Sequence, residues 1–187
     1  MTRERLFIAA FPDPECRDEL RDRVKMLRIQ HPEWRFVQPA RWHMTLLYLG
    51  QHEHPDWACI DGAKHGLRAM HIPATTARLD TVMALGNQQR PAVVLSCTAP
   101  PAGFATLHDQ LSTNLHGPCI THKSEHPFKP HVTLAYASLP LPVPTAVTSV
   151  TFRLTRVHLL RSVAGSHQYD VVVSTSLPDR GRGQHSG

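Results

Sequence analysis

The sequence predicts an α+β fold of two pseudo-symmetric lobes, in which antiparallel sheets line a central cleft and helices lie outside. Two observations predict it. The phrase His-x-Thr-Leu-x-Tyr occurs at residues 43–48 and again at residues 131–136. Each copy is a Leu/Val/Tyr-rich run with a proline upstream, which favours a short buried strand. Each copy also follows a segment whose apolar residues recur at helical spacing, so a strand–helix–strand unit is used twice.

The first half of the chain begins with a strand predicted at residues 5–11. Asp13 is a good N-cap for the next helix, and Pro14 suits its first position. That helix ends near residues 31–32. A short strand at 35–37 precedes the first motif strand, which ends at Gly50. Asp56 caps a second helix with an inward stripe of Trp57, Ile60, Ala63, Leu67 and Met70.

The second half contains strands predicted at residues 76–85 and 92–97, joined by a turn-rich link at 86–91. A third helix, with apolar residues from Phe104 to Leu115, leads through a loop to the second motif strand. A long strand pair at 150–161 and 168–174 closes the fold. We expect residues 1–178 to form one bilobal domain with a lobe boundary near 86–91, and residues 179–187, rich in Gly, Arg and Ser, to be a disordered tail.

Composition sets limits on the class of protein. A chain of 187 residues with 41% hydrophobic content is sufficient for one compact domain. No run approaches the roughly 20 apolar residues that span a bilayer, and the first apolar run is too short for a signal peptide, so we expect a cytoplasmic protein with no membrane partner. A monomer is the default expectation, and the sequence leaves the oligomeric state open. The four cysteines show no disulfide spacing, which predicts reduced thiols. A net charge of +5 and a pI near 9.3 are compatible with nucleic-acid phosphates.

The repeated motif carries residues suited to acid–base chemistry. Side chains two residues apart on a strand share a face, so His43 lies beside Thr45, and His131 beside Thr133. Imidazoles titrate near neutral pH, so two of them on opposite sides of a phosphorus atom supply an acid and a base. Neutral hydroxyl donors stabilise the charge that develops on the non-bridging oxygens. These four residues are therefore the candidate catalytic set, and they form a sufficient set without a metal or cofactor.

These motifs resemble those of the two-histidine (2H) phosphoesterase superfamily, and most closely its RNA 2′,3′-cyclic phosphodiesterase (2′-5′ RNA ligase) family. The Pro-Phe-Lys-Pro run at 127–130, the first strand and the stretch from His158 to Tyr169 extend the resemblance over residues 5–175. It implies hydrolysis of the 2′,3′-cyclic phosphate ends of RNA or oligonucleotides to 2′-phosphates, with a weak reverse 2′-5′ ligase activity. Our hypothesis is that His43 protonates the leaving oxygen and His131 activates water; the sequence leaves the reverse assignment open.

Candidate substrate-binding residues follow from aromatic character and from the resemblance. Aromatic side chains stack on bases, which makes Phe11, Phe36, Trp42 and Tyr169 candidates, each with a core role as the alternative. The resemblance and their charge suggest phosphate contacts for Lys129 and Arg161, with a solvated surface position as the alternative for Arg161.

The family often has arginine at the positions of His126 and Tyr136, so this chain lacks those cations. Ideal alternation along the strand places Tyr136 on the face opposite His131. We therefore expect the two replacements to tune the substrate rather than remove the chemistry.

A second interpretation of the chain uses a different cluster. His116, Cys119, His122 and His126 have ligand types and spacings that a zinc site uses, which suggests a zinc-binding module. Chance histidines in a proline-containing loop are the simpler explanation. A non-catalytic RNA-end-binding protein is another alternative, and the presence of all four motif residues argues against it. The sequence leaves the physiological substrate open.

Overall fold

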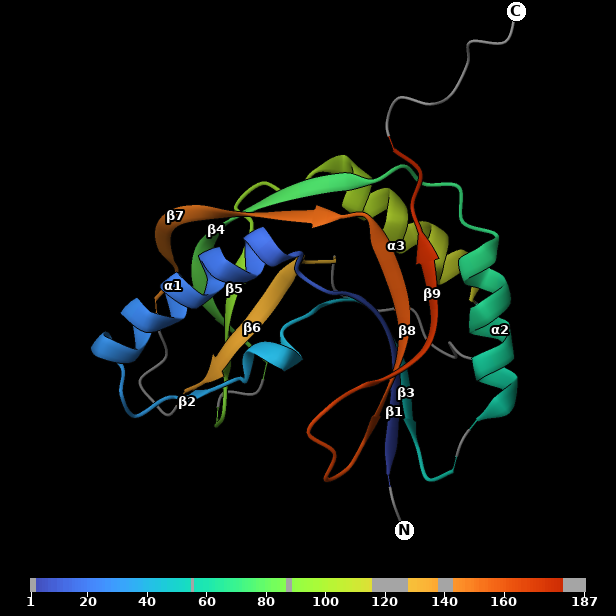
Figure 1. Ribbon diagram of the computed structural model, residues 1–187, viewed down its shortest axis with the longest axis horizontal. Coiled ribbons are helices and arrows are strands. Elements are labelled where there is room, and N and C mark those ends of the chain that lie inside the picture. The colour runs from blue at the N-terminus through green and yellow to red at the C-terminus, as the bar shows by residue number, and fades with distance from the viewer. Residues whose placement is uncertain (1–2, 55, 87–88, 116–127, 138–142, 180–187) are drawn as a thin grey trace, which may run out of the picture.

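The strands form two antiparallel sheets in the computed structural model, which describes residues 3–54, 56–86, 89–115, 128–137 and 143–179 (Figure 1). The four-stranded sheet has the order β3-β1-β8-β9, with β1 at Glu4–Ala10, β3 at Met44–His52, β8 at Arg156–Val163 and β9 at Asp170–Ser176. The five-stranded sheet has the order β2-β6-β5-β4-β7, with β2 at Arg35–Phe36, β4 at Thr75–Leu85, β5 at Ala92–Ser96, β6 at His131–Tyr136 and β7 at Thr145–Leu154. The predicted α+β class with antiparallel sheets is confirmed.

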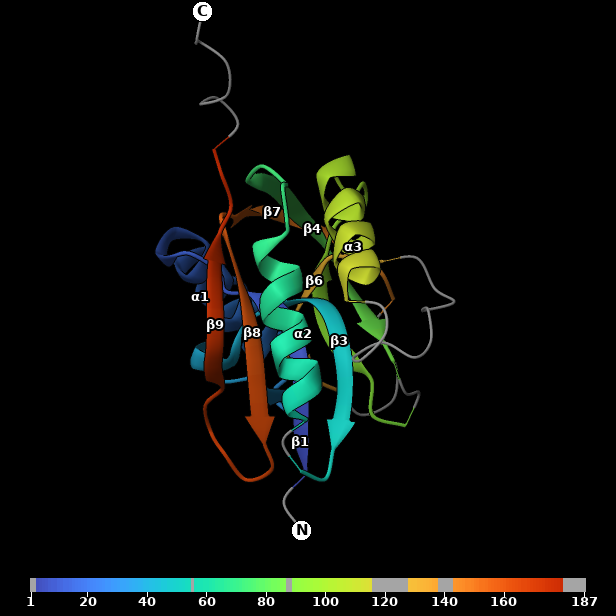
Figure 2. The same cartoon turned by 90° about the vertical axis from the view of Figure 1, so that its right-hand side faces the viewer.

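Three α-helices lie in the described part of the chain: α1 at Pro14–Gln30, α2 at Trp57–Arg68 and α3 at Ala102–Asn114. Both predicted N-caps are confirmed, because the carboxylate of Asp13 accepts from the backbone N–H of Cys16 at 2.8 Å and that of Asp56 from Cys59 at 2.9 Å. The α1 helix packs beside β7, and α2 lies along the flank of β8 and β9 (Figures 1 and 2). The helices thus cover the sheets from outside.

The chain changes sheets where the sequence predicted one continuous strand. Residues 150–161 are divided at Thr155: β7 pairs with β4 in the five-stranded sheet, and β8 pairs with β1 and β9 in the other. The expectation of one continuous strand was wrong. The residues before Thr155 pair with β4, and those after it pair with β1 and β9, so the chain passes from one sheet to the other at Thr155. Residues 86–91, where we expected the lobes to divide, join β4 and β5, which are adjacent in one sheet. The two sheets therefore do not correspond to two consecutive halves of the sequence.

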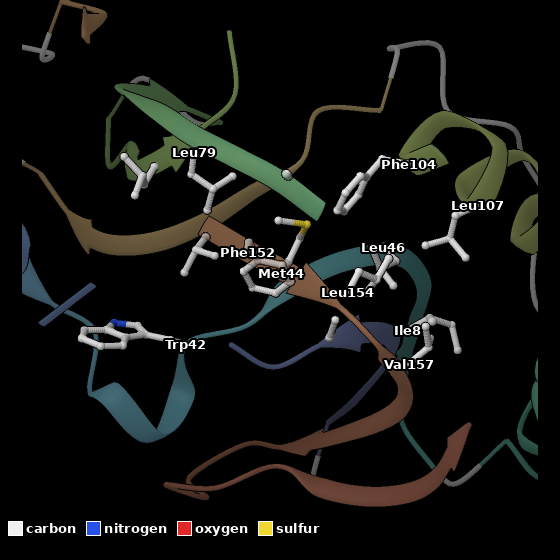
Figure 3. Close-up of a cluster of buried hydrophobic side chains, with 14 of the residues drawn as sticks. Ile8, Trp42, Met44, Leu46, Leu79, Phe104, Leu107, Phe152, Leu154 and Val157 are labelled. Atoms are coloured by element: carbon white, nitrogen blue, oxygen red, sulfur yellow. The ribbon is translucent and has the colours of Figure 1, made fainter. Parts of the chain in front are cut away.

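A single hydrophobic core is shared by both sheets and all three helices. Met44 and Leu46 of β3 point into it beside Phe152 of β7 and Phe104 of α3 (Figure 3). A smaller cluster of Phe7, Ala9 and Leu160 lies apart from this core, and Phe11 and Tyr169 pack against it. Since Ile8 belongs to the main core and Phe7 and Ala9 to the small cluster, β1 is apolar on both faces. The face of β1 that carries Phe7 and Ala9 borders the candidate site.

Two further sequence expectations concern cysteines and helix packing. Cys16 and Cys97 are free and buried, whereas Cys59 is disulfide-bonded, so the expectation of four reduced thiols was wrong. Trp57 was expected to face inward and is 64% exposed, because the buried stripe of α2 begins two residues after it with Cys59 and Ile60. Among the described residues, no helix is long and apolar enough to cross a membrane.

Candidate active site

The two motif histidines are held in the same way. The Nδ1–H of His43 donates to the backbone carbonyl of Arg41 at 2.8 Å, and the Nδ1–H of His131 donates to that of Lys129 at 2.7 Å. Each acceptor lies two residues before its histidine. A hydrogen bond at Nδ1 fixes the tautomer of the neutral ring and leaves the lone pair on Nε2. Each imidazole is therefore prepared to accept or donate a proton through Nε2.

Burial sets the protonation of both rings. Removal from water lowers the pKa of His43 below its ordinary value, and the positive charges of His131 and Arg41 lower it further. Removal from water also lowers the pKa of His131, with a smaller contribution from the charge of Lys129. The carbonyl bonds act in the opposite direction, because each favours the protonated ring. Both side chains remain partly exposed, so neither is sealed from solvent.

One cleft of about 530 Å³ brings the two motifs together. His43 and Thr45 line it from the four-stranded sheet and Thr133 from the five-stranded sheet. Strands β3 and β6 contact each other, and the charge of His131 acts on the pKa of His43. Thr133 thus lies at one cleft with His43 and Thr45, whereas His131 is not among the residues that line it and is linked to His43 by the effect of its charge.

A β-bulge in each motif strand changes which side chains face this cleft. The register of β3 against β1 skips Leu46, and the register of β6 against β5 skips Leu134. A bulge adds one residue to one strand, so side-chain alternation shifts by one beyond it. In both motifs the threonine and the tyrosine three residues later therefore line the same cleft. The expectation that Tyr136 lies on the face opposite His131 was wrong for this reason.

Positive charge and aromatic rings line the rest of the cleft. Its arginines are Arg5, Arg35 and Arg41, and no Asp or Glu is among its described lining residues. The guanidinium carbon of Arg41 lies 4.5 Å from the centre of the Tyr169 ring, and that ring stands edge-on to His43 at 5.0 Å between centroids. A cleft with cations and no carboxylates suits an anionic ligand.

Comparison with known proteins decides the family. The model of the 2′-5′ RNA ligase superfamily matches residues 12–166, which include both motifs and the strands that carry them. The chain belongs to the 2′-5′ RNA ligase superfamily. The resemblance seen in the sequence is confirmed.

Relatives of this superfamily member include an RNA 2′,3′-cyclic phosphodiesterase of Thermus thermophilus, 30% identical over 168 residues, 84% of this chain and 81% of the relative. The crystal structure of E. coli LigT complexed with 3′-AMP is similar, with a TM-score of 0.74 and 25% identity over 94% of this chain and 98% of that one. The crystal structure of TT0787, also of Thermus thermophilus, gives a TM-score of 0.72 and 26% identity over 94% and 99%. The protein is homologous to cyclic phosphodiesterases and has the LigT-like fold.

Of the aromatic candidates, Tyr169 and Phe36 line the cleft, and Phe36 also packs against the main core. Trp42 is 1% exposed and lies in the main core, where no base reaches it (Figure 3). Its indole N–H has no hydrogen-bond partner within the described ranges. Phe11 packs against the small cluster, with its ring 5.0 Å from that of His158, and does not line the cleft. The expectation of base stacking therefore does not hold for Trp42 and has no support from the position of Phe11.

The two cationic candidates also differ from expectation. Arg161 pairs with Asp170 at 2.9 Å and with Glu4 at 3.8 Å, and its register partner Leu6 points into the main core. Arg161 thus lies on the face away from the cleft with its charge compensated, which argues against a phosphate contact. Lys129 is exposed, with its ammonium 3.7 Å from the sulfur of Met83, and does not line the cleft. Its closest link to the site is the carbonyl that holds His131.

Sequence reasoning missed Arg5, Arg35 and Arg41. One signal was present for Arg41: a cation stands two residues before the histidine in both copies of the motif, Arg41 in one and Lys129 in the other. Arg35 and Arg5 have no such signal, because only strand pairing brings them to the cleft. The candidate zinc ligands His116, Cys119, His122 and His126 lie outside the described residues, so that alternative stays a prediction.

Proposed function

We propose that this protein is an RNA 2′,3′-cyclic phosphodiesterase that opens terminal 2′,3′-cyclic phosphates to 2′-phosphates, with His43 and His131 as acid and base. One observation carries the proposal. The two imidazoles are held through Nδ1 by equivalent carbonyls, and each has its threonine at the same cleft. In-line displacement needs two proton-transfer groups on opposite sides of the phosphorus atom, and two imidazoles that each keep Nε2 available support that role.

The reaction uses one water molecule. Its oxygen attacks phosphorus while Nε2 of His131 takes its proton, and the bond from phosphorus to O3′ breaks as His43 donates a proton to O3′. The product is a 2′-phosphate with a free 3′-hydroxyl. Thr45 and Thr133 donate hydrogen bonds to the non-bridging oxygens, where negative charge develops. With an RNA 5′-hydroxyl in place of water, the same groups join two ends through a 2′-5′ bond, as a weak reverse activity.

The direct test is turnover of adenosine 2′,3′-cyclic phosphate and of an RNA oligonucleotide with a cyclic end. We expect both substrates to yield 2′-phosphate, which phosphorus NMR distinguishes from 3′-phosphate. The rate should be unchanged in EDTA, because side chains alone provide the proton transfers. Binding without turnover would favour the RNA-end-binding alternative, and loss of activity in EDTA would contradict acid–base catalysis by histidines alone.

The pH dependence follows from the lowered pKa values of both histidines. One ring must be neutral and the other protonated, so kcat/KM is bell-shaped between their two pKa values. Burial lowers both pKa values, so we expect the maximum below about pH 6.5, the ordinary value for histidine. Activity then falls from that maximum as pH rises through neutrality. A maximum clearly above pH 7 would contradict this prediction.

Lys129 provides a control for the pH profile. Its positive charge lowers the pKa of His131, and its ammonium does not line the cleft. The Lys129→Met variant lacks the repulsion between the Lys129 ammonium and protonated His131 but keeps the backbone carbonyl. The pKa of His131 should therefore rise, and the limb of the pH–rate profile that reports it should move to higher pH.

A further inference from the structure

The ring of Tyr136 carries two guanidinium groups. The guanidinium carbon of Arg35 lies 5.2 Å from the ring centre, and that of Arg90 lies 5.9 Å from it. They come from the two sides of β6: Arg35 of β2 is the direct register partner of Tyr136, and Arg90 stands two residues before Ala92, the register partner of Tyr136 in β5. Sheet pairing thus gathers both cations on one aromatic side chain. We refer to Arg35, Tyr136 and Arg90 as the arginine–tyrosine cluster.

The charges of this cluster are not neutralised by neighbouring carboxylates. Arg35 and Arg90 form no ion pair with any described residue, whereas Arg153 and Arg161 each pair with two carboxylates. The adjoining cleft has no described acidic lining residue. A guanidinium that rests on an aromatic ring is oriented by it and keeps its N–H donors for another partner. Two such groups held on one ring offer charge-assisted donors to a phosphate.

The cluster lies at a defined distance from the catalytic residues. Tyr136 follows Thr133 by three residues on β6, which corresponds to roughly 7–10 Å along the strand. Strands β3 and β6 both run toward the side of the molecule where the N-terminus lies (Figures 1 and 2). The cluster therefore stands beyond the threonine in the direction of that side. Arg35 and Tyr136 line the cleft, and Arg90 lies outside its lining, within 5.9 Å of the Tyr136 ring centre.

Tyr48 occupies the position in the first motif that Tyr136 occupies in the second, but its surroundings differ. Tyr48 also lines the cleft and is 54% exposed, yet no guanidinium of a described residue lies over its ring. Among the described residues that line the cleft, Tyr136 is therefore the one ring with two guanidinium groups over it, whereas Tyr169 carries Arg41 alone. A bound oligonucleotide would therefore place its next phosphate on the Tyr136 side of the cleft rather than on the Tyr48 side.

We propose that the arginine–tyrosine cluster binds the phosphodiester that links the cyclic-phosphate nucleotide to the preceding nucleotide. The inference rests on the proposed function and narrows its substrate class. The enzyme acts on oligonucleotides of at least two residues in preference to mononucleoside cyclic phosphates. Arg35 and Arg90 contact the linking phosphate, and Tyr136 is a positioning residue that orients both.

The test compares two substrates that differ by the linking phosphate and its nucleoside. These are adenosine 2′,3′-cyclic phosphate and the dinucleotide ApA with a 2′,3′-cyclic phosphate end. The wild type should have the higher kcat/KM for the dinucleotide. In the double variant Arg35→Ala/Arg90→Ala, the ratio of the two kcat/KM values should fall about tenfold, since two charge-assisted contacts are lost. Tyr136→Leu should lower the ratio about threefold, and Tyr136→Phe, which keeps the ring, should retain it.

Arg78→Ala is the matched control for net charge. Arg78 is exposed, donates to the hydroxyl of Ser149 and does not line the cleft. Its removal should leave the ratio at the wild-type value. An unchanged ratio in the double variant, or an equal fall in Arg78→Ala, would overturn the inference.

An equilibrium measurement separates this inference from the proposed function. Calorimetric titration with adenosine 2′-phosphate and with ApA carrying a terminal 2′-phosphate tests the cluster without turnover. Tighter binding of the dinucleotide that is lost in the double variant supports the cluster even if neither cyclic substrate is hydrolysed. Equal affinities in wild type and double variant refute it even if both substrates are hydrolysed.

Discussion

Replacing His131 with alanine is expected to lower kcat/KM for a 2′,3′-cyclic phosphate by about 10²–10⁴-fold, the usual contribution of a positioned acid or base. The alanine leaves no group to accept the proton of the attacking water. His43→Ala should have a loss of the same order, because the leaving oxygen then departs without a proton. The double variant should lose little more than either single variant, since the two histidines act on one displacement. Steady-state hydrolysis at the pH of maximal activity measures all three.

His71→Ala is the control for these variants. His71 makes the same local bond, from Nδ1–H to the carbonyl two residues upstream in Ala69 at 2.8 Å, but it is exposed and does not line the cleft. Its replacement should leave kcat/KM at the wild-type value. Circular dichroism and thermal melting establish that each variant is folded. A folded His43→Ala or His131→Ala protein with near wild-type turnover would end the proposed mechanism.

Replacing Trp42 with alanine is expected to lower the free energy of unfolding by about 3–5 kcal/mol, as removal of a large buried aromatic side chain does. Trp42 is 1% exposed and packs in the core shared by the two sheets. It stands between Arg41, whose carbonyl holds His43, and His43 itself. The cavity should therefore also reduce activity in the protein that remains folded. Urea denaturation followed by circular dichroism measures the stability change.

Trp57→Ala is the matched control for that variant. Trp57 is 64% exposed, so its loss removes little buried surface, and a change within about 0.5 kcal/mol is expected. Equal destabilisation by the two substitutions would contradict the packing described here. The pair also separates the two interpretations of Trp42, because a base-stacking residue would weaken binding without a large loss of stability.

Much of the site was predictable from local sequence. The four motif residues, the strand position of each motif and the helix caps at Asp13 and Asp56 depend on residue type and spacing over a few positions. The aromatic and cationic candidates were less predictable. Trp42 and Tyr169 are both aromatic side chains near a functional segment, yet one packs in the core and the other lines the cleft. Arg161 is neutralised by Glu4 and Asp170, of which Glu4 is far away in sequence.

The sequence by itself determined the four candidate catalytic residues of this protein, because a histidine and a threonine two residues apart share a face on any strand. Only the tertiary structure decided what surrounds them. The bulges at Leu46 and Leu134 turn two tyrosines toward the cleft, and the pairing of β2 and β5 with β6 brings Arg35 and Arg90 to one of those rings. Strand register and the break at Thr155 depend on contacts between distant segments, which local residue preferences do not specify.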